Sequence, residues 1–399
     1  MRVSIAAAFK HVGTPATWPP AAQMQRGGTP TIKLFEMNTF NKPLITTIAG
    51  ALICFSTLSA HDGEIHRSSQ ADDHAPISIM GDHTHKQNEW MISYRFMQMH
   101  MEGMRSGTDR LSANEVFAQG YTVTPEEMNM DMHMLGLMYA PSDQLTLMLM
   151  ANYSEIEMKH RIYPGAPMML INAVGGDTFT TRSNGWGDTK LMGLYTLYTK
   201  DERKLHATLG LSLPTGAINT KDRTPKPGMP PSFPEQQLPA PMQLGSGTYD
   251  LLPALTYVNQ IDQFSYGLQS SAILRLEDEN SHGYRLGHRF ETAAWVSYLL
   301  DPSLSLSTGL RYRYDGKLKG EQENIGLMGP NGRSVTTAFD ENYGGERVDV
   351  SFGLNYLFTS GILKGHRLAA EIHLPVWQDL NGLQLETDRT ITIGWQKAF

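Results

Sequence analysis

Residues 304–314 read Leu304-Ser-Leu-Ser-Thr-Gly-Leu-Arg-Tyr-Arg-Tyr314. Large apolar or aromatic residues alternate in this stretch with small or charged residues. A period of two puts every second side chain on the same face of a β-strand, whereas a helix would show a period near 3.6. The stretch therefore predicts a strand with one apolar face and one polar face, and the polar face carries Arg311 and Arg313.

The same alternation recurs from residue 89 to the C-terminus and predicts about twelve strands. Each segment is close to, or slightly longer than, the roughly 9–11 residues with which a tilted strand crosses a bilayer. The predicted strands lie at residues 89–101, 128–140, 144–158, 185–199, 203–213, 247–259, 263–276, 287–300, 303–314, 346–358, 366–376 and 388–399.

The connections between these segments alternate between long and short. Short ones include Pro141-Ser-Asp143 and Lys200-Asp-Glu202, whereas 102–127, 159–184 and 214–246 are long. Outer-membrane barrels have short periplasmic turns and longer extracellular loops, and closure gives every backbone group a partner. A soluble sandwich gives no reason for such alternation. We therefore predict an all-β fold, a transmembrane antiparallel up-and-down β-barrel over residues 89–399 with both termini in the periplasm.

The N-terminal part has the pattern of an export signal. Lys42 precedes an apolar run that ends at Phe55, and Ala60 is suitable for cleavage, which predicts a signal peptide at 37–60. Residues 1–36 fit no part of a signal and are interpreted as an upstream extension. Residues 61–88 are predicted to be a His-rich periplasmic segment. The single cysteine, Cys54, lies within the signal, so the mature chain has no disulfide or thiolate metal site.

Charge and the C-terminus indicate which partners to expect. The net charge of −7 argues against nucleic acid, because no basic surface is available to neutralise phosphates. The last strand, Ile391 to Phe399, alternates and ends on an aromatic residue. It resembles the signal by which the barrel-assembly machinery recognises outer-membrane proteins. We expect the protein to lie in the cell outer membrane, where lipid and lipopolysaccharide surround it.

Several short motifs resemble a known family. They include Met80-Gly-Asp-His-Thr-His85, Glu89-Trp-Met-Ile-Ser-Tyr-Arg-Phe96, Met134-Leu-Gly-Leu-Met-Tyr-Ala-Pro141, Gly187-Asp-Thr-Lys-Leu191, Ser212-Leu-Pro-Thr-Gly216, Gly245-Ser-Gly-Thr-Tyr-Asp250 and Gln378-Asp-Leu-Asn-Gly382. Together they look like the transporter-type family named for the phenol-degradation meta-cleavage pathway, over nearly all of the chain from about residue 78. The resemblance implies an outer-membrane barrel that passes small molecules, with the substrate left open.

Charged residues fall repeatedly on the face that should line the lumen. Such a wall can line a hydrated pore and orient a polar or anionic solute, or it can form a paired network that fills a narrow barrel. The sequence leaves both alternatives open. The predicted lumen-lining residues are Arg95, His206, Arg275, Arg311, Arg313, Arg347, Asp349, Glu371 and His373, with Glu291 on the same face.

Methionine is concentrated on the same inner face. Thirteen of the 23 methionines fall between residues 91 and 158. Thioethers are ligands for soft ions such as Cu(I), and histidines before the barrel would add imidazole donors. Methionine can equally fill an irregular lumen as flexible apolar bulk, and a polar tail tolerates histidines. The candidate metal ligands are Met97, Met99, Met101, Met130, Met132, Met134, His83 and His85.

A lipid-modifying enzyme is a third alternative, since some barrels of this size carry catalytic groups on the outer face. His100, Glu102, Asn129, Asp131 and His133 would face outward near the long loops. No Gly-x-Ser-x-Gly motif is present. We therefore expect no enzymatic activity. The predicted function is a channel for passive passage of small molecules, including aromatic or metal-related solutes, with a copper-binding barrel as the alternative.

Overall fold

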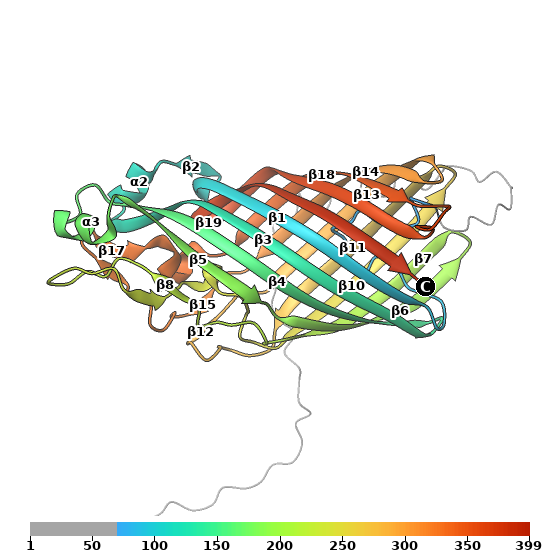
Figure 1. Ribbon diagram of the computed structural model, residues 1–399, viewed down its shortest axis with the longest axis horizontal. Helices are drawn as coiled ribbons and strands as arrows, with labels where there is room; N and C mark the ends of the chain where they lie inside the picture. Colours follow the sequence, from blue (N-terminus) through green and yellow to red (C-terminus); the bar gives the residue numbers. More distant parts are fainter. Residues whose placement is uncertain (1–69) are drawn as a thin grey trace, which may run out of the picture. The chain divides into compact units, whose positions relative to one another are not determined.

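The computed structural model describes residues 70–399. The predicted upstream extension and signal peptide lie outside these residues. Long antiparallel strands form a sheet that closes on itself, since β3 pairs with β1 on one side and with β4 on the other (Figure 1). Around the ring the order is β1, β19, β18, β14, β13, β11, β10, β7, β6, β4 and β3. The prediction of a closed antiparallel barrel is confirmed.

The strands of the wall follow one another around the barrel. Their bounds are β1 Trp90–Gly107, β3 Tyr121–Ser142, β4 Leu145–Ile162, β6 Thr189–Lys200, β7 Arg203–Leu213, β10 Asp250–Ile261, β11 Phe264–Arg275, β13 Arg289–Asp301, β14 Leu304–Asp315, β18 Gly345–Leu357 and β19 His366–Ala398.

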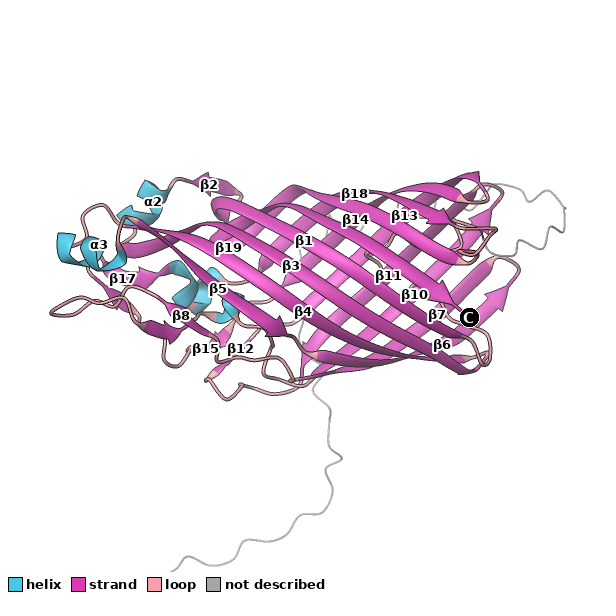
Figure 2. Ribbon diagram, viewed as in Figure 1, coloured by secondary structure: helices cyan, strands magenta, loops and turns pink. Residues whose placement is uncertain are grey.

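Tight turns join strands at one end of the barrel, the short-turn end, and larger connections lie at the other, the long-loop end. At the turns after β6 and β10, Asp201 and Asp262 adopt φ near +53°, a conformation that Asp tolerates in two-residue hairpins. The helices and short strands gather at the end opposite the C-terminus (Figure 2). In the part of the chain that is described, no helix is long and apolar enough to cross a membrane.

The long-loop end has more regular structure than the sequence indicates. Its elements are β2 Asp109–Leu111, α2 Ala113–Ala118, α3 Met168–Val174, β5 Thr178–Trp186, β8 Lys221–Arg223, β9 Glu235–Gln237, β12 Tyr284–Arg285, β15 Lys319–Gly320, β16 Met328–Gly329, β17 Gly332–Val335 and the 3-10 helices Ala240–Met242, Thr336–Ala338 and Asp340–Asn342. Three of them, β2, β5 and β17, extend the wall by pairing with β1, β4 and β3.

The last element differs from the prediction. Residues 377–387, predicted to be a loop, are part of β19, whose residues 367–380 pair with β18 and 380–398 with β1. The two arms lie side by side, because Trp395 Nε1 donates to His366 Nδ1 at 3.0 Å. The side chain of Gln378 closes the hairpin by bonding both the N–H and the carbonyl of Thr387. This side-chain bridge holds the two arms of the hairpin together, although the composition of the segment predicts a loop.

The period of two separates the two faces as the sequence predicts. In β14, Ser305 and Ser307 are buried, whereas Leu306 and Leu310 are 47% and 58% exposed. Leu209, Phe264, Val296 and Phe352 on other strands are also exposed. The large apolar side chains therefore cover the outside of the barrel, and small or charged ones face the lumen.

Candidate functional site in the barrel lumen

Most of residues 70–88, the luminal segment, lies inside the barrel, whereas the sequence predicts that 61–88 form a periplasmic tail. The segment contacts inward-facing side chains on opposite sides of the wall. His206 Nε2 of β7 is 2.8 Å from the carbonyl of Gly81, and Arg95 Nε of β1 is 3.0 Å from that of Ile77. A chain that touches strands all around a closed sheet must run through its interior.

The wall satisfies the backbone of the luminal segment, which has few sheet partners of its own. Arg367 donates to the carbonyl of Ala75 at 2.6 Å, and Gln269 to that of Met80 at 2.9 Å. Glu371 accepts the N–H of Ser78 at 2.9 Å, and Arg311 donates to the Ser78 hydroxyl at 2.6 Å. Buried backbone groups need such partners, so these contacts explain why a polar segment is stable there.

Contacts with the wall place the segment along the barrel axis. Ser305 near the start of β14 bonds to Ala71, and Thr146 near the start of β4 bonds to His85. Both ends of the segment are therefore at the short-turn end. Its middle, at Ser78, meets Arg311 and Glu371 farther along their strands. The luminal segment enters from the short-turn end, reaches the interior and returns.

The predicted lumen-lining residues divide into two groups. Arg95, His206, Arg311, Glu371 and His373 contact the luminal segment. Arg275, Arg313 and Arg347 instead line a cavity of about 240 Å³ toward the long-loop end, with Asp349 paired to Arg347. The sequence analysis missed Arg289 and Arg367, although each lies on the inward parity of its strand. Extending the alternation through both strands would have found them.

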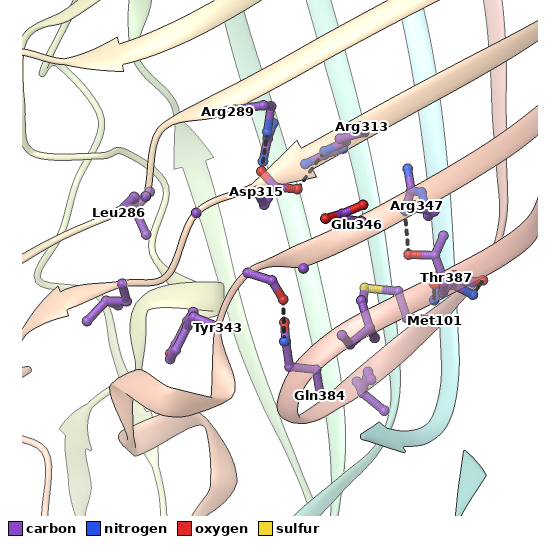
Figure 3. Close-up of a pocket in the computed structure, with 18 of the residues that line it drawn as sticks. Met101, Leu286, Arg289, Arg313, Asp315, Tyr343, Glu346, Arg347, Gln384 and Thr387 are labelled. Carbon is purple, nitrogen blue, oxygen red and sulfur yellow. Dashed lines mark hydrogen bonds and ion pairs between the residues drawn. The ribbon is translucent and has the colours of Figure 1, made fainter. Parts of the chain in front are cut away.

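Guanidinium groups converge on one carboxylate in this cavity (Figure 3). Asp315 accepts from Arg289 Nε at 2.5 Å through one oxygen and from Arg313 Nε at 2.7 Å through the other. Arg347 Nε lies 2.9 Å from Asp349, and Arg275 pairs with Asp250. Carboxylates hold the arginines in place, but Arg289 and Arg313 share a single one. Among the residues that line the cavity, the four arginines outnumber the two carboxylates, Asp315 and Glu346.

The rest of the cavity wall is mixed, with apolar side chains beside Glu346, Gln378, Gln384 and Thr387. The cavity is also lined by Met99, Met101, Leu286, Leu318 and Leu385. An apolar surface favours a hydrocarbon body, and fixed guanidinium groups favour a carboxylate or another polar oxygen. The cavity can therefore accept a small molecule that has both.

We expect Asp315→Asn to increase the preference of the lumen for anions. The change removes the negative charge between Arg289 and Arg313, so the local potential becomes more positive. The anion-to-cation permeability ratio should rise about twofold or more, as judged from the reversal potential across a KCl gradient. Asp379→Asn, which removes an exposed carboxylate from β19, is the matched control. A ratio that changes equally in both variants would contradict the assignment.

The predicted methionine patch is distributed over three strands. Met97 pairs across strands with Met132, and Met99 with Met130. The most buried methionines form two separate clusters, however. One holds Met91, Met138, Met148 and Met150, with Met80 and Met192 beside it, and the other holds Met104, Met128, Met158 and Met242, with Met101 and Met130 beside it. Met134 is opposite Arg95. Cu(I) binding by this wall stays a prediction.

His83 and His85 lie in the luminal segment rather than on the methionine wall. Their rings are 4.8 Å apart, and the ring of His74 is 4.5 Å from that of His83. The sequence analysis counts His74 among the histidines before the barrel that would add imidazole donors, but it does not include Asp82. A local sequence pattern could not bring residues 74 and 83 together, because the intervening turn is fixed by contacts with the barrel wall.

The residues considered for a lipid-modifying enzyme lie on β1 and β3, which are neighbouring strands of the barrel wall. His100 Nδ1 is 2.8 Å from Asn129 Oδ1, and His100 Nε2 is 3.5 Å from Glu102. His133 Nδ1 is 2.8 Å from the Tyr94 hydroxyl. Within residues 70–399, no serine hydroxyl hydrogen-bonds to either histidine.

Comparisons with known proteins support the fold. No family model matches the sequence, and curated proteins give no match either. Among solved structures, the chain is similar to the COG4313 outer membrane channel from Pseudomonas putida F1, with TM-score 0.52 and 16% identity over 80% of this chain and 99% of that one.

Two weaker likenesses are to a FadL homologue and to a hydrocarbon channel. A Pseudomonas aeruginosa FadL homologue has TM-score 0.37 and 9% identity, over 77% of this chain and 89% of that one. The TodX monoaromatic hydrocarbon channel, as a deltaS2S3 mutant, has TM-score 0.40 and 10% identity, over 79% and 91%. The first likeness supports the barrel architecture at nearly the full length of the similar chain.

Proposed function

We propose that the chain is an outer-membrane channel for the passive passage of small molecules. The observation that carries the proposal is a cavity of about 240 Å³ inside a closed barrel, with the luminal segment between it and the short-turn end. The similarity to an outer membrane channel of known structure supports it. Passage requires no catalytic group, and the proposal assigns none.

The outer surface supports insertion in a lipid bilayer. Exposed Leu, Ile, Val, Phe, Tyr and Trp side chains lie on the outward face of the wall strands, as expected for contact with lipid. With β19 counted as two arms, the wall crosses the membrane twelve times, so both ends of the barrel domain lie on the periplasmic side with the short turns. Phe399 is exposed at the end of β19, where the barrel-assembly machinery could bind it.

We expect Leu209→Arg to destabilise the inserted barrel. Leu209 lies near the middle of β7 and is 61% exposed, so the charged side chain would face the bilayer core. The free energy of unfolding should fall by about 2–4 kcal/mol, since Arg is disfavoured most at the midplane. Denaturant titration in lipid vesicles measures this free energy of unfolding. Leu276→Arg, just after β11 at the long-loop end, is the matched control and should cost only about 0–1 kcal/mol. Equal losses would argue against a bilayer around the barrel.

The solute that we propose is a small molecule with an apolar body and one anionic or polar group. The methionine and leucine side chains would contact the body, and Arg313 and Arg347 would bind the polar group. Aromatic acids have this form. The resemblance to the phenol meta-cleavage family is in agreement with such solutes, and membership of that family is part of the proposal.

Uptake by proteoliposomes tests the function. The refolded full chain should admit benzoate faster than arabinose, and Arg313→Gln/Arg347→Gln should reduce the benzoate rate while leaving arabinose unchanged. The control Arg182→Gln/Arg223→Gln removes two exposed arginines outside the cavity. Uptake of neither solute above that of empty vesicles would contradict the channel. Equal rates for the two solutes would agree with a channel but would refute the proposed class of solute.

A further inference from the structure

The luminal segment brings three metal-binding side chains together inside the barrel. His83 Nδ1 is 2.9 Å from one oxygen of Asp82, and His74 Nδ1 is 3.7 Å from the other. The ligand atoms of all three residues lie within 4.8 Å of one another. Around a tetrahedral ion with bonds of about 2.0–2.1 Å, ligand atoms are about 3.3 Å apart. Small side-chain rotations would therefore suffice to bind one ion.

The environment leaves these imidazoles without better partners. Asp82 is 4% exposed, and most of the His74 and His83 side chains is buried. His74 Nδ1 and both ring nitrogens of His83 are buried and have no hydrogen-bond partner among residues 70–399, and the two Nδ1 atoms face the Asp82 carboxylate. Buried polar nitrogens are normally satisfied, so unsatisfied ones clustered around a carboxylate call for a ligand that accepts their lone pairs.

We propose that His74, Asp82 and His83 form a binding site for one divalent transition-metal ion. The ion connects the part of the luminal segment that enters the lumen to the part that returns. Two imidazoles and a carboxylate suit Zn²⁺ and Cu²⁺. Ions held mainly by charge, such as Mg²⁺ and Ca²⁺, are disfavoured, because Arg95 and Arg367 lie close enough to interact with Asp82. This site is distinct from the methionine wall and from the cavity near Arg313.

The position of the site gives the ion a structural role. His74 precedes the innermost contacts at Ile77 and Ser78, and Asp82 and His83 follow them. An ion held from both sides would close this turn into a loop and reduce its freedom to leave the lumen. Bound metal therefore favours the closed state of the channel.

Copper spectroscopy and calorimetry test the site in the full refolded chain, without a histidine tag. Cu²⁺ added at one equivalent should give an electron paramagnetic resonance spectrum with nitrogen hyperfine structure from two imidazoles, and titration with Zn²⁺ should show saturable binding. His74→Gln/His83→Gln should lose this spectrum and one equivalent of Zn²⁺. Mg²⁺ at the same concentrations should give no binding heat.

A matched variant separates this site from other histidines. His100→Gln/His282→Gln removes two histidines elsewhere, one of them from the cluster of His100, Glu102 and Asp388, and should keep the wild-type spectrum. Heat-modifiable migration in gel electrophoresis verifies that each variant is folded. The single variants His74→Gln and His83→Gln should each lose one nitrogen from the pattern. A wild-type spectrum without imidazole nitrogens, or one unchanged in His74→Gln/His83→Gln, would refute the site and would not bear on solute passage.

Discussion

Replacing residues 72–83 with a Gly-Ser linker of the same length should raise single-channel conductance about tenfold, because the luminal segment fills the interior at the short-turn end. The native segment is held by side chains from the wall, including Arg367 to Ala75 and Glu371 to Ser78. A linker has no side chains that match these contacts, so it would not remain in the lumen. Planar-bilayer recordings of the refolded variant and the wild type measure the change.

The control for this replacement is an equal substitution in a long loop. Residues 221–232, which include β8, lie at the long-loop end, and replacing them with the same linker should leave conductance near the wild-type value. Two results would contradict the assignment: no increase in the luminal variant, or an equal increase in both variants. In either case the luminal segment would not be the barrier.

Gly394→Leu should also open the channel, by about threefold, through a single side chain on the wall. A Cβ atom at Gly394 would lie 2.7 Å from Ile77 Cγ1 and 2.8 Å from Ile77 Cδ1. Both distances are too short for carbon atoms, and Ile77 is 2% exposed and closely packed, so the added side chain should displace the luminal segment from β19. At Gly394 the wall is hydrogen-bonded to β1 and is the more rigid partner. Conductance under the same conditions is the measurement.

Gly193→Leu is the matched control for this substitution. A Cβ atom at Gly193 would be 3.7 Å from Leu145 Cδ1, an ordinary contact. Its neighbours Leu191 and Tyr195 are exposed, so the new side chain would join the outer face. Conductance should stay unchanged in this variant. If Gly394→Leu behaves like Gly193→Leu, the luminal segment does not limit passage.

The sequence alone predicts much of the barrel. Because alternate side chains of a strand point to opposite faces, a run such as Leu304 to Tyr314 defines both an outer and an inner face. The predicted strand 203–213 coincides with β7, and those at 263–276 and 303–314 differ from β11 and β14 by one residue at each end. The same alternation predicts that residues such as Arg95 and Glu371 face inward.

Predictions based on composition are less accurate than those based on period. Residues 377–387 are polar and were assigned to a loop, yet Gln378 and Thr387 bond to each other inside a hairpin. Residues 61–88 have no strand pattern and were assigned to a tail. Whether a polar segment stays in solvent or enters a lumen depends on partners far away in the sequence, such as Arg311 for Ser78.

The sequence by itself determined the two-faced strands, and with them the closed sheet, since local side-chain order decides which face each residue takes. Only the tertiary structure decided what the lumen holds. Placing residues 70–88 inside the barrel, pairing Arg289 and Arg313 with Asp315, and joining His74 to Asp82 and His83 all depend on contacts between residues distant in sequence or on a turn fixed by the wall. Such contacts arise from closure of the barrel, and no local period encodes them.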